Sequence, residues 1–192
     1  MTRKQFIASV LALAPLLGFL WAFAEGTIFF IVPDVLISLV ALFSFRRFSV
    51  CAIAATLGSI IAGMLVYYMA AYQPADTKTI IQSVPFVTQK MFVAVQTGYD
   101  HHGAWALATA PISGIPYKIH AFLAPAHVEM LPFILISIPA RLLRFFVVGG
   151  LSFLIGFLAR RRKGNPSGKL LAAHAIFWSI FYALYWLKVM QP

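Results

Sequence analysis

The chain has 192 residues, of which 61% are hydrophobic and only 10% are charged. Soluble domains carry about 25% charged residues, so the composition excludes an ordinary soluble protein and predicts an integral membrane protein with a single domain. The formal net charge of +10 is typical of cytoplasmic ends that meet anionic lipid headgroups, and we favour this interpretation over a nucleic-acid partner.

The first apolar region, which ends near residue 45, predicts a helical hairpin. It divides into two segments, about Phe6 to Phe23 and about Thr27 to Phe45. Neither is a clean run of the roughly 20 apolar residues that a spanning helix needs. The interrupting residues are Pro15, Gly18, Glu25, Gly26 and Pro33. Arg3-Lys4 and Arg46-Arg47 flank the region, so the positive-inside rule predicts that both of its ends are cytoplasmic.

The N-terminus also imitates a secretory signal peptide. Arg3-Lys4 precedes an apolar run, and Ala22-Phe23-Ala24 has the small residues of a cleavage site. Because later segments supply the rest of a protein that crosses the membrane several times, we favour an uncleaved first membrane segment.

The middle of the chain combines one uninterrupted span with a polar stretch. Residues 50–72 predict a membrane helix that ends outside, and Gly58 and Gly63 give it a small-residue face for close helix contact. In residues 73–100, apolar side chains recur at helical spacing around Pro85. We therefore expect one or two amphipathic helices on the outer interface, in preference to a ligand-binding loop.

The second half predicts another broken hairpin, entered from outside, and two further spans. Residues 103–124 are apolar but contain Pro111, Gly114, Pro116 and Lys118. Residues 131–159 predict one long helix that descends to Arg160-Arg161-Arg162-Lys163, the strongest cytoplasmic marker in the chain. Residues 164–168 predict a turn, and residues 170–187 predict the last span, which places the C-terminus outside.

These segments predict an all-α integral membrane fold with an inverted repeat. The first half is a hairpin plus a span, residues 1–72, and the second half is a hairpin plus a span, residues 101–159. An interfacial segment, residues 73–100, separates them, and a cytoplasmic basic loop, residues 160–169, leads to the last span, residues 170–192. In inverted repeats, binding sites lie at the repeat interface.

Five ionisable residues lie within apolar segments. They are Glu25, Asp34, Lys118, Arg141 and Arg144. A charge in hydrocarbon costs at least a few kcal/mol, so it usually lines a pathway or pairs with an opposite charge. Arg141 and Arg144 share one helical face, and their planar guanidinium groups suit phosphate. The acids would balance charge or carry protons. The alternative, which stays open, is a set of ion pairs that only hold the fold together.

Motifs around these charges carry a resemblance to a known family. They are Glu25 with Pro33-Asp34, Ile115-Pro116-Tyr117-Lys118, and Arg141 and Arg144 with Phe145-Phe146. Over roughly residues 20 to 160 they resemble the DedA/VTT superfamily of membrane proteins, within it the YqaA-like branch. The chain differs in having Leu123-Ala124-Pro125 in place of the family's Ala-Ala-Gly turn, and many relatives have arginine where Lys118 stands.

The resemblance implies two facing re-entrant hairpins, shaped by Pro33, Pro111 and Pro116, and a role in lipid translocation. Relatives are implicated in moving undecaprenyl phosphate, in scrambling phospholipids and in proton-linked membrane homeostasis. We therefore expect a transporter or scramblase of phosphate-bearing lipids in the inner (plasma) membrane. The alternative is a non-transporting membrane scaffold or homeostasis protein.

The chemistry-bearing residues do not favour an enzyme. No nucleophile stands beside a base, and the sequence has neither a Cys/His metal cluster nor a glycine-rich phosphate loop. We expect no catalytic residue, no metal and no cofactor. The expected partners are membrane lipids with anionic headgroups; proton coupling and a homo-oligomer are left open.

Overall fold

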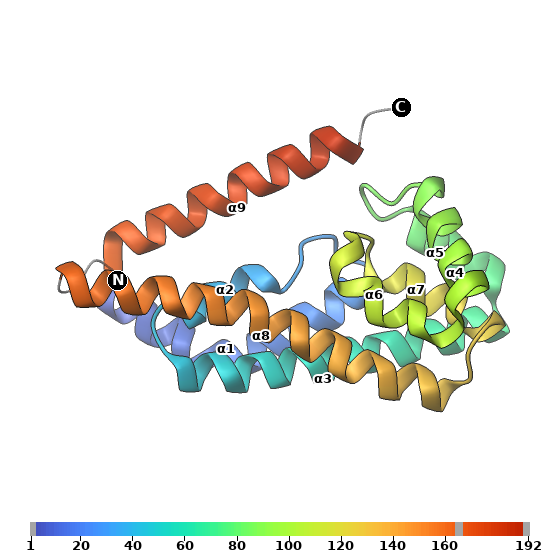
Figure 1. Cartoon of the computed structure of the whole chain (residues 1–192), viewed down its shortest axis with the longest axis horizontal. Coiled ribbons are helices and arrows are strands. Elements are labelled where there is room, and N and C mark those ends of the chain that lie inside the picture. The colour runs from blue at the N-terminus through green and yellow to red at the C-terminus, as the bar shows by residue number, and fades with distance from the viewer. Residues whose placement is uncertain (1–2, 164–166, 190–192) are drawn as a thin grey trace.

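A computed structural model describes residues 3–163 and 167–189 of the chain, and within them all regular structure is helical. The helices are α1 (Arg3–Thr27), α2 (Asp34–Ala41), α3 (Phe45–Tyr72), α4 (Pro74–Gln82), α5 (Gln89–His102), α6 (Ala106–Ser113), α7 (Tyr117–Leu123), α8 (Met130–Lys163) and α9 (Ser167–Val189). Short 3₁₀ turns lie at Gly103–Trp105 and Ala124–Ala126. The prediction of an all-α fold is confirmed (Figure 1). The predicted turn at residues 164–168 begins with 164–166, which lie outside the described residues.

Three helices are long and apolar enough to cross a membrane: α3, residues 130–161 of α8 and residues 168–189 of α9. At 1.5 Å per residue, the 28 residues of α3 extend about 42 Å, more than the roughly 30 Å of a bilayer's hydrocarbon core. Large apolar side chains on these helices stay exposed, among them Leu57, Leu143 and Leu184. The chain is therefore a membrane-embedded protein, and the three predicted spans are confirmed as apolar helices of spanning length.

Helix α1 is continuous, although an interruption at Pro15 and Gly18 was expected from the sequence. The neighbouring α3 supports it at this point. The Cys51 thiol donates a hydrogen bond to the Ala14 carbonyl over 3.2 Å, and a Cβ at Gly18 would lie only 2.7 Å from the Cys51 sulfur. A proline is tolerated inside a membrane helix where a neighbouring helix supports the backbone around it.

The predicted second segment, about residues 27–45, is interrupted at Pro33 as expected, and less of it is helical than its apolar sequence suggests. Residues 28–33 form a loop, and only the eight residues of α2 are helical before α3 begins. Pro33 disfavours a helical conformation at Val32. Side chains bind the loop's backbone instead: Trp21 Nε1 donates to the Ile31 carbonyl at 2.9 Å, and the Val32 N–H donates to the Tyr182 hydroxyl at 2.8 Å.

Where the sequence predicted amphipathic helices and a broken hairpin, residues 74–123 form four short α-helices. Helices α6 and α7 are joined by residues 114–116, where Gly114 has a φ of +72°, a left-handed conformation that glycine adopts at little cost. Pro116 directly precedes α7, whereas Pro111 lies inside α6 and does not break it. Helices α4 and α5 are separated by residues 83–88 and bury Ile81 and Val95 against α7.

Small residues let the long helices approach closely. Gly58 of α3 faces the Phe19 carbonyl of α1, and a Cβ at Gly26 of α1 would lie 2.5 Å from the Ala62 methyl group of α3. Helices α1 and α3 therefore run side by side in the same direction, and α2 returns along them (Figure 1). Gly63 of α3 faces the Tyr117 ring, so α3 also contacts the second hairpin.

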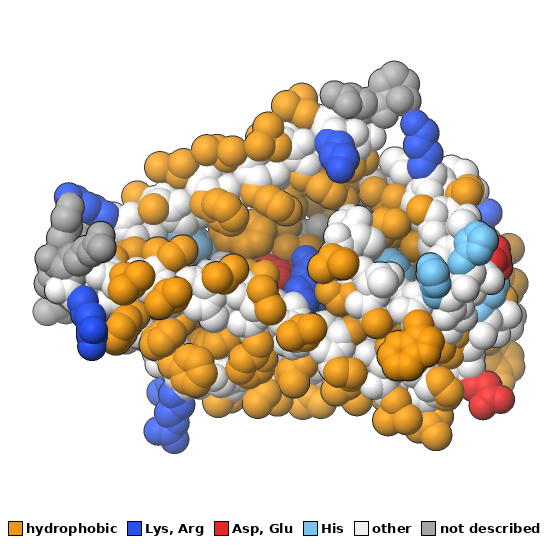
Figure 2. All heavy atoms as spheres, in the orientation of Figure 1, with side chains coloured by type: hydrophobic (Ala, Val, Ile, Leu, Met, Phe, Trp, Pro, Cys, Tyr) orange, Lys and Arg blue, Asp and Glu red, His pale blue; other side chains and the backbone are white. Residues whose placement is uncertain are grey.

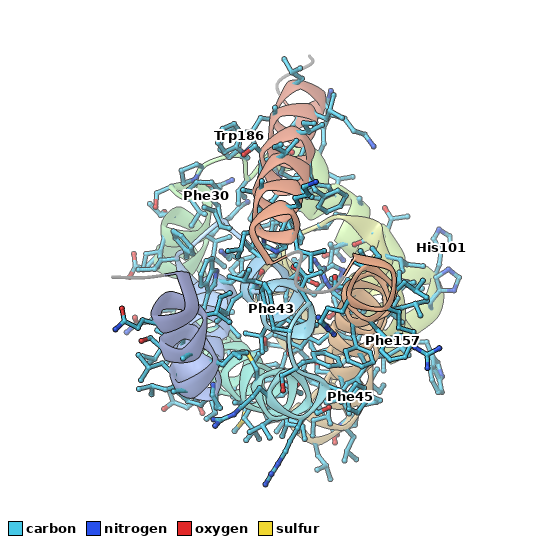
Figure 3. The ribbon with its side chains drawn as sticks, turned by 90° about the vertical axis from the view of Figure 1, so that its left-hand side faces the viewer. Phe30, Phe43, Phe45, His101, Phe157 and Trp186 are labelled. Carbon is cyan, nitrogen blue, oxygen red and sulfur yellow. The ribbon has the colours of Figure 1, made fainter. Side chains whose placement is uncertain are left out.

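Helix α9 stands apart from the remaining helices (Figures 1 and 3). Its contacts with the other elements include hydrogen bonds and ring contacts made by aromatic side chains and His174. The Ser38 hydroxyl of α2 lies 2.9 Å from His174 Nε2 and accepts a hydrogen bond from Trp178 Nε1 at 3.0 Å. Farther along, the Trp186 ring lies 6.1 Å from that of Phe30, a pair labelled in Figure 3.

We expect Gly58→Ala to lower the free energy of unfolding by about 1–3 kcal/mol, because the new methyl group would collide with the Phe19 backbone and force α1 away from α3. Unfolding of the purified protein in detergent would measure this. Gly150→Ala on α8 is the matched control, since nothing lies within 4 Å of a Cβ there. Equal stabilities of the two variants would contradict the close packing of α1 on α3.

Candidate functional site

The structure brings all five predicted site residues together at the centre of the helical bundle. Glu25 lies near the end of α1, Asp34 begins α2 and Lys118 lies in the first turn of α7, while Arg141 and Arg144 lie on α8. The Arg141 side chain contacts Ser59, at the midpoint of α3. The site is thus about 20 Å from either end of α3.

Glu25 and Arg141 form a buried ion pair. Arg141 Nη2 lies 2.7 Å from Glu25 Oε2, and the two side chains are 5% and 4% exposed. The same nitrogen donates to the Ser59 hydroxyl at 2.9 Å. The guanidinium carbon also lies 4.9 Å from the Tyr117 ring centre and 5.1 Å from that of Phe145, so the faces of two aromatic rings stabilise the cation.

Asp34 and Arg144 form a second, two-pronged pair. Arg144 Nε donates to Asp34 Oδ1 at 3.2 Å and Nη2 donates to Oδ2 at 3.1 Å. Nη1 donates to the Pro111 carbonyl at 3.3 Å, which links α8 to α6. The Arg144 side chain is 21% exposed, whereas that of Asp34 is 2% exposed. Of the two arginines, Arg144 is therefore the one within reach of a group from outside.

Lys118 joins the turns of the two hairpins. Its Nζ donates to the Phe29 carbonyl, in the loop after α1, at 2.7 Å. The residue is 1% exposed, and none of the ion pairs in the described part of the chain involves it. The buried ammonium group therefore connects the start of α7 to the loop after α1 and is bound by a backbone oxygen.

A hollow opens beside this site. Figure 2 shows acidic and basic side-chain atoms at the floor of the hollow between α9 and α8, with hydrophobic side chains around it. Helices α8 and α9 carry many exposed apolar side chains. The arrangement gives a polar floor between apolar walls, at the depth where a membrane would be most apolar.

Sequence reasoning missed several groups that complete the site. The Ser59 hydroxyl and the carbonyls of Phe29 and Pro111 bind the cations. Backbone carbonyls leave no trace in a sequence. Ser59 gave a faint indication, since it is a polar residue between the small residues of an apolar span.

The comparisons with known proteins add no assignment: no family model, curated protein or solved structure matches the chain. The functional argument therefore rests on the geometry of the site.

We expect the Glu25–Arg141 pair to behave as one unit. Arg141→Met leaves a buried carboxylate unpaired and should lower the free energy of unfolding by about 3–5 kcal/mol. Glu25→Gln in the same protein should restore part of that loss, because no lone charge then stays buried. Unfolding titrations of the two single variants and the double variant would measure the coupling.

The exposed Arg47 on α3 provides the control: Arg47→Met should change stability by no more than about 0.5 kcal/mol. Strictly additive effects of the Glu25 and Arg141 substitutions would show that the ion pair contributes nothing specific.

Proposed function

We propose that the protein moves phosphate-bearing lipids across the membrane, as a transporter or scramblase. The observation that carries this proposal is the charge of the central site. Three cations, Lys118, Arg141 and Arg144, accompany two acids, Glu25 and Asp34, which leaves one positive charge without a carboxylate partner among the described residues. An uncompensated charge at this depth is costly, and the monoanionic phosphate of a lipid headgroup would balance it.

We also propose that both hairpins are re-entrant, entering from opposite faces as an inverted repeat. Support comes from helix lengths. Gly26, at the end of α1, lies beside Ala62, ten residues before the end of α3, so the chain turns back about 15 Å short of that end. Helices α2, α6 and α7 have only seven or eight residues. The DedA/VTT resemblance implies the same arrangement.

The alternative function is that of a membrane scaffold, and one observation favours it. Both arginines already bind carboxylates within the protein. This arrangement is expected of charges whose role is only to stabilise the fold. The two functions differ in what the protein does to lipids, so a transport assay separates them.

Arg144→Lys should slow lipid movement about tenfold while the protein still folds, because lysine keeps the charge but loses the planar grip on two oxygens. Purified protein would be reconstituted into liposomes that contain a fluorescent phosphatidylglycerol, and the rate at which the label becomes accessible to an impermeant quencher would be measured.

The control for this assay is Arg47→Lys, which makes the same exchange at an exposed position in the first turn of α3. This variant should move lipid at the wild-type rate. Wild-type protein that moves lipid no faster than empty liposomes would overturn the transport proposal. Wild-type movement with an unaffected Arg144→Lys variant would remove Arg144 from the pathway.

We propose further that the basic end of the molecule faces the cytoplasm of a cell's plasma (inner) membrane and that the C-terminus lies outside. The start of α3, the end of α8 and the start of α9 carry basic residues: Arg46, Arg47, Arg160, Arg161 and Lys169. The acids outside the central site, Asp76, Asp100 and Glu129, lie on segments at the opposite end (Figure 1). This asymmetry follows the positive-inside rule.

In a Cys51→Ser protein, Lys169→Cys should react with an impermeant maleimide only from the cytoplasmic side, and Asp76→Cys only from outside. Both positions are exposed. Labelling of intact cells and of inverted vesicles would be compared. Reaction of both cysteines from one side would contradict the proposed orientation.

A further inference from the structure

A small cavity lies beside Arg141, between the second hairpin and α8. Its volume is about 10 Å³, and its lining comprises Leu107, Ala110, Pro111, Ile115, Tyr117, Ser137, Ala140 and Arg141. That is about the space of one water-sized group. Five of these residues belong to α6, α7 or the turn between them, and three belong to α8.

Three polar atoms of the lining residues have no hydrogen-bond partner of good geometry within the described part of the chain. They are the Tyr117 hydroxyl, the Ser137 hydroxyl and Arg141 Nε. The residues that carry them are 3%, 1% and 5% exposed, so bulk water does not satisfy these atoms. Buried polar groups in native proteins nearly always have a partner. Three unpartnered groups on the wall of one cavity therefore indicate that a bound group belongs there.

The chemistry of the three atoms restricts that group. Arg141 Nε can only donate a hydrogen bond, and each hydroxyl can donate as well. An apolar group would leave all three unsatisfied. An oxygen with several lone pairs can accept from all of them, and an anionic oxygen does so best, because hydrogen bonds to a charged acceptor are the stronger ones.

We propose that this cavity is an oxygen subsite that holds one phosphate oxygen of a lipid headgroup, bound by Tyr117, Ser137 and Arg141 Nε. The identity of the ligand rests on the transport function proposed above. Arg141 can serve the subsite without releasing Glu25, because its bond to Glu25 uses Nη2 and leaves Nε free. Tyr117, which belongs to the Ile115-Pro116-Tyr117-Lys118 motif, and Ser137, which no motif includes, thereby become binding residues.

The surroundings of the subsite suit the rest of such a headgroup. Pro111, Ile115 and Ala140 are partly exposed, so the cavity opens between the tip of the second hairpin and α8. The Pro111 carbonyl also accepts a hydrogen bond from Arg144, so the partly exposed guanidinium of Arg144 borders the opening. A phosphate with one oxygen in the cavity would have its other oxygens near Arg144.

The test removes the two hydroxyls singly. Neither has a hydrogen-bond partner of good geometry among the described residues, although the two hydroxyls lie close to each other, so Tyr117→Phe and Ser137→Ala should change the unfolding temperature without lipid only slightly. Each should weaken phosphatidylglycerol binding about fivefold, the effect of one lost hydrogen bond. Binding would be measured as the rise in unfolding temperature when phosphatidylglycerol is titrated into the detergent-solubilised protein, with a diacylglycerol of the same chains as the phosphate-free probe.

Matched controls keep the two substitutions interpretable. Tyr67→Phe removes a hydroxyl that binds the Val128 carbonyl, and Ser152→Ala removes one on α8 that binds the Val148 carbonyl. Both should bind phosphatidylglycerol like the wild type. Equal binding by Tyr117→Phe, Ser137→Ala and the wild type would overturn the subsite, as would a wild-type response to diacylglycerol as large as that to phosphatidylglycerol. The transport proposal fails separately, if the wild type binds phosphatidylglycerol at this site yet moves no lipid in liposomes.

Discussion

The structure depends on one constraint, which is that charges at the centre of a membrane-embedded bundle must find partners inside the protein. Each of the two carboxylates meets a guanidinium: Glu25 binds Arg141 and Asp34 binds Arg144. These bonds join the end of α1 and the start of α2 to α8. Because removal of one member of a buried pair costs several kcal/mol, the pairs fix the positions of the two halves of the first hairpin against the long helix.

The close approach of the backbones follows from the same requirement. A guanidinium can reach Ser59 and Glu25 together only if α1 lies directly against α3, and Gly26 and Gly58 permit that contact. The loop between α1 and α2 follows this contact and is for the most part only partly buried, and protein groups satisfy part of its backbone. Trp21, Lys118 and Tyr182 supply these hydrogen bonds. The close packing of α1 on α3 is therefore what allows these polar groups to form their hydrogen bonds.

The coarse fold could be predicted from the sequence because apolar runs and turn residues indicate helices and turns without reference to the rest of the chain. Long apolar runs gave α3, α8 and α9, and Gly114 with Pro116 marked the turn between α6 and α7. Prediction from the sequence failed where a neighbouring element decides the outcome. Pro15 does not interrupt α1, which is supported by α3, and the loop at residues 28–33 is held by side chains from three other elements.

The members of the central site were predictable, but their pairing was not. Charge within apolar segments singled out Glu25, Asp34 and the two arginines, and spacing put the arginines on one face. Which acid meets which arginine depends on how α1 and α2 cross α8, and a sequence does not contain that angle. Serines within apolar helices often bond their own backbone, as Ser152 does, so the sequence gave only a faint indication for Ser59 and none for Ser137.

The lipid binding that we propose and stable ion pairs would place opposite demands on the arginines, and the geometry of each arginine would meet them differently. Arg141 is fully buried and keeps Glu25 through Nη2 while Nε remains free, so it can accept a ligand without breaking its pair. All three nitrogens of Arg144 donate hydrogen bonds to Asp34 or Pro111, but the side chain is partly exposed. Water or a lipid headgroup could therefore take the place of Asp34 or Pro111 as an acceptor. In the transport that we propose, the Glu25–Arg141 pair would stay intact, and the partly exposed Asp34–Arg144 pair would exchange with a lipid headgroup.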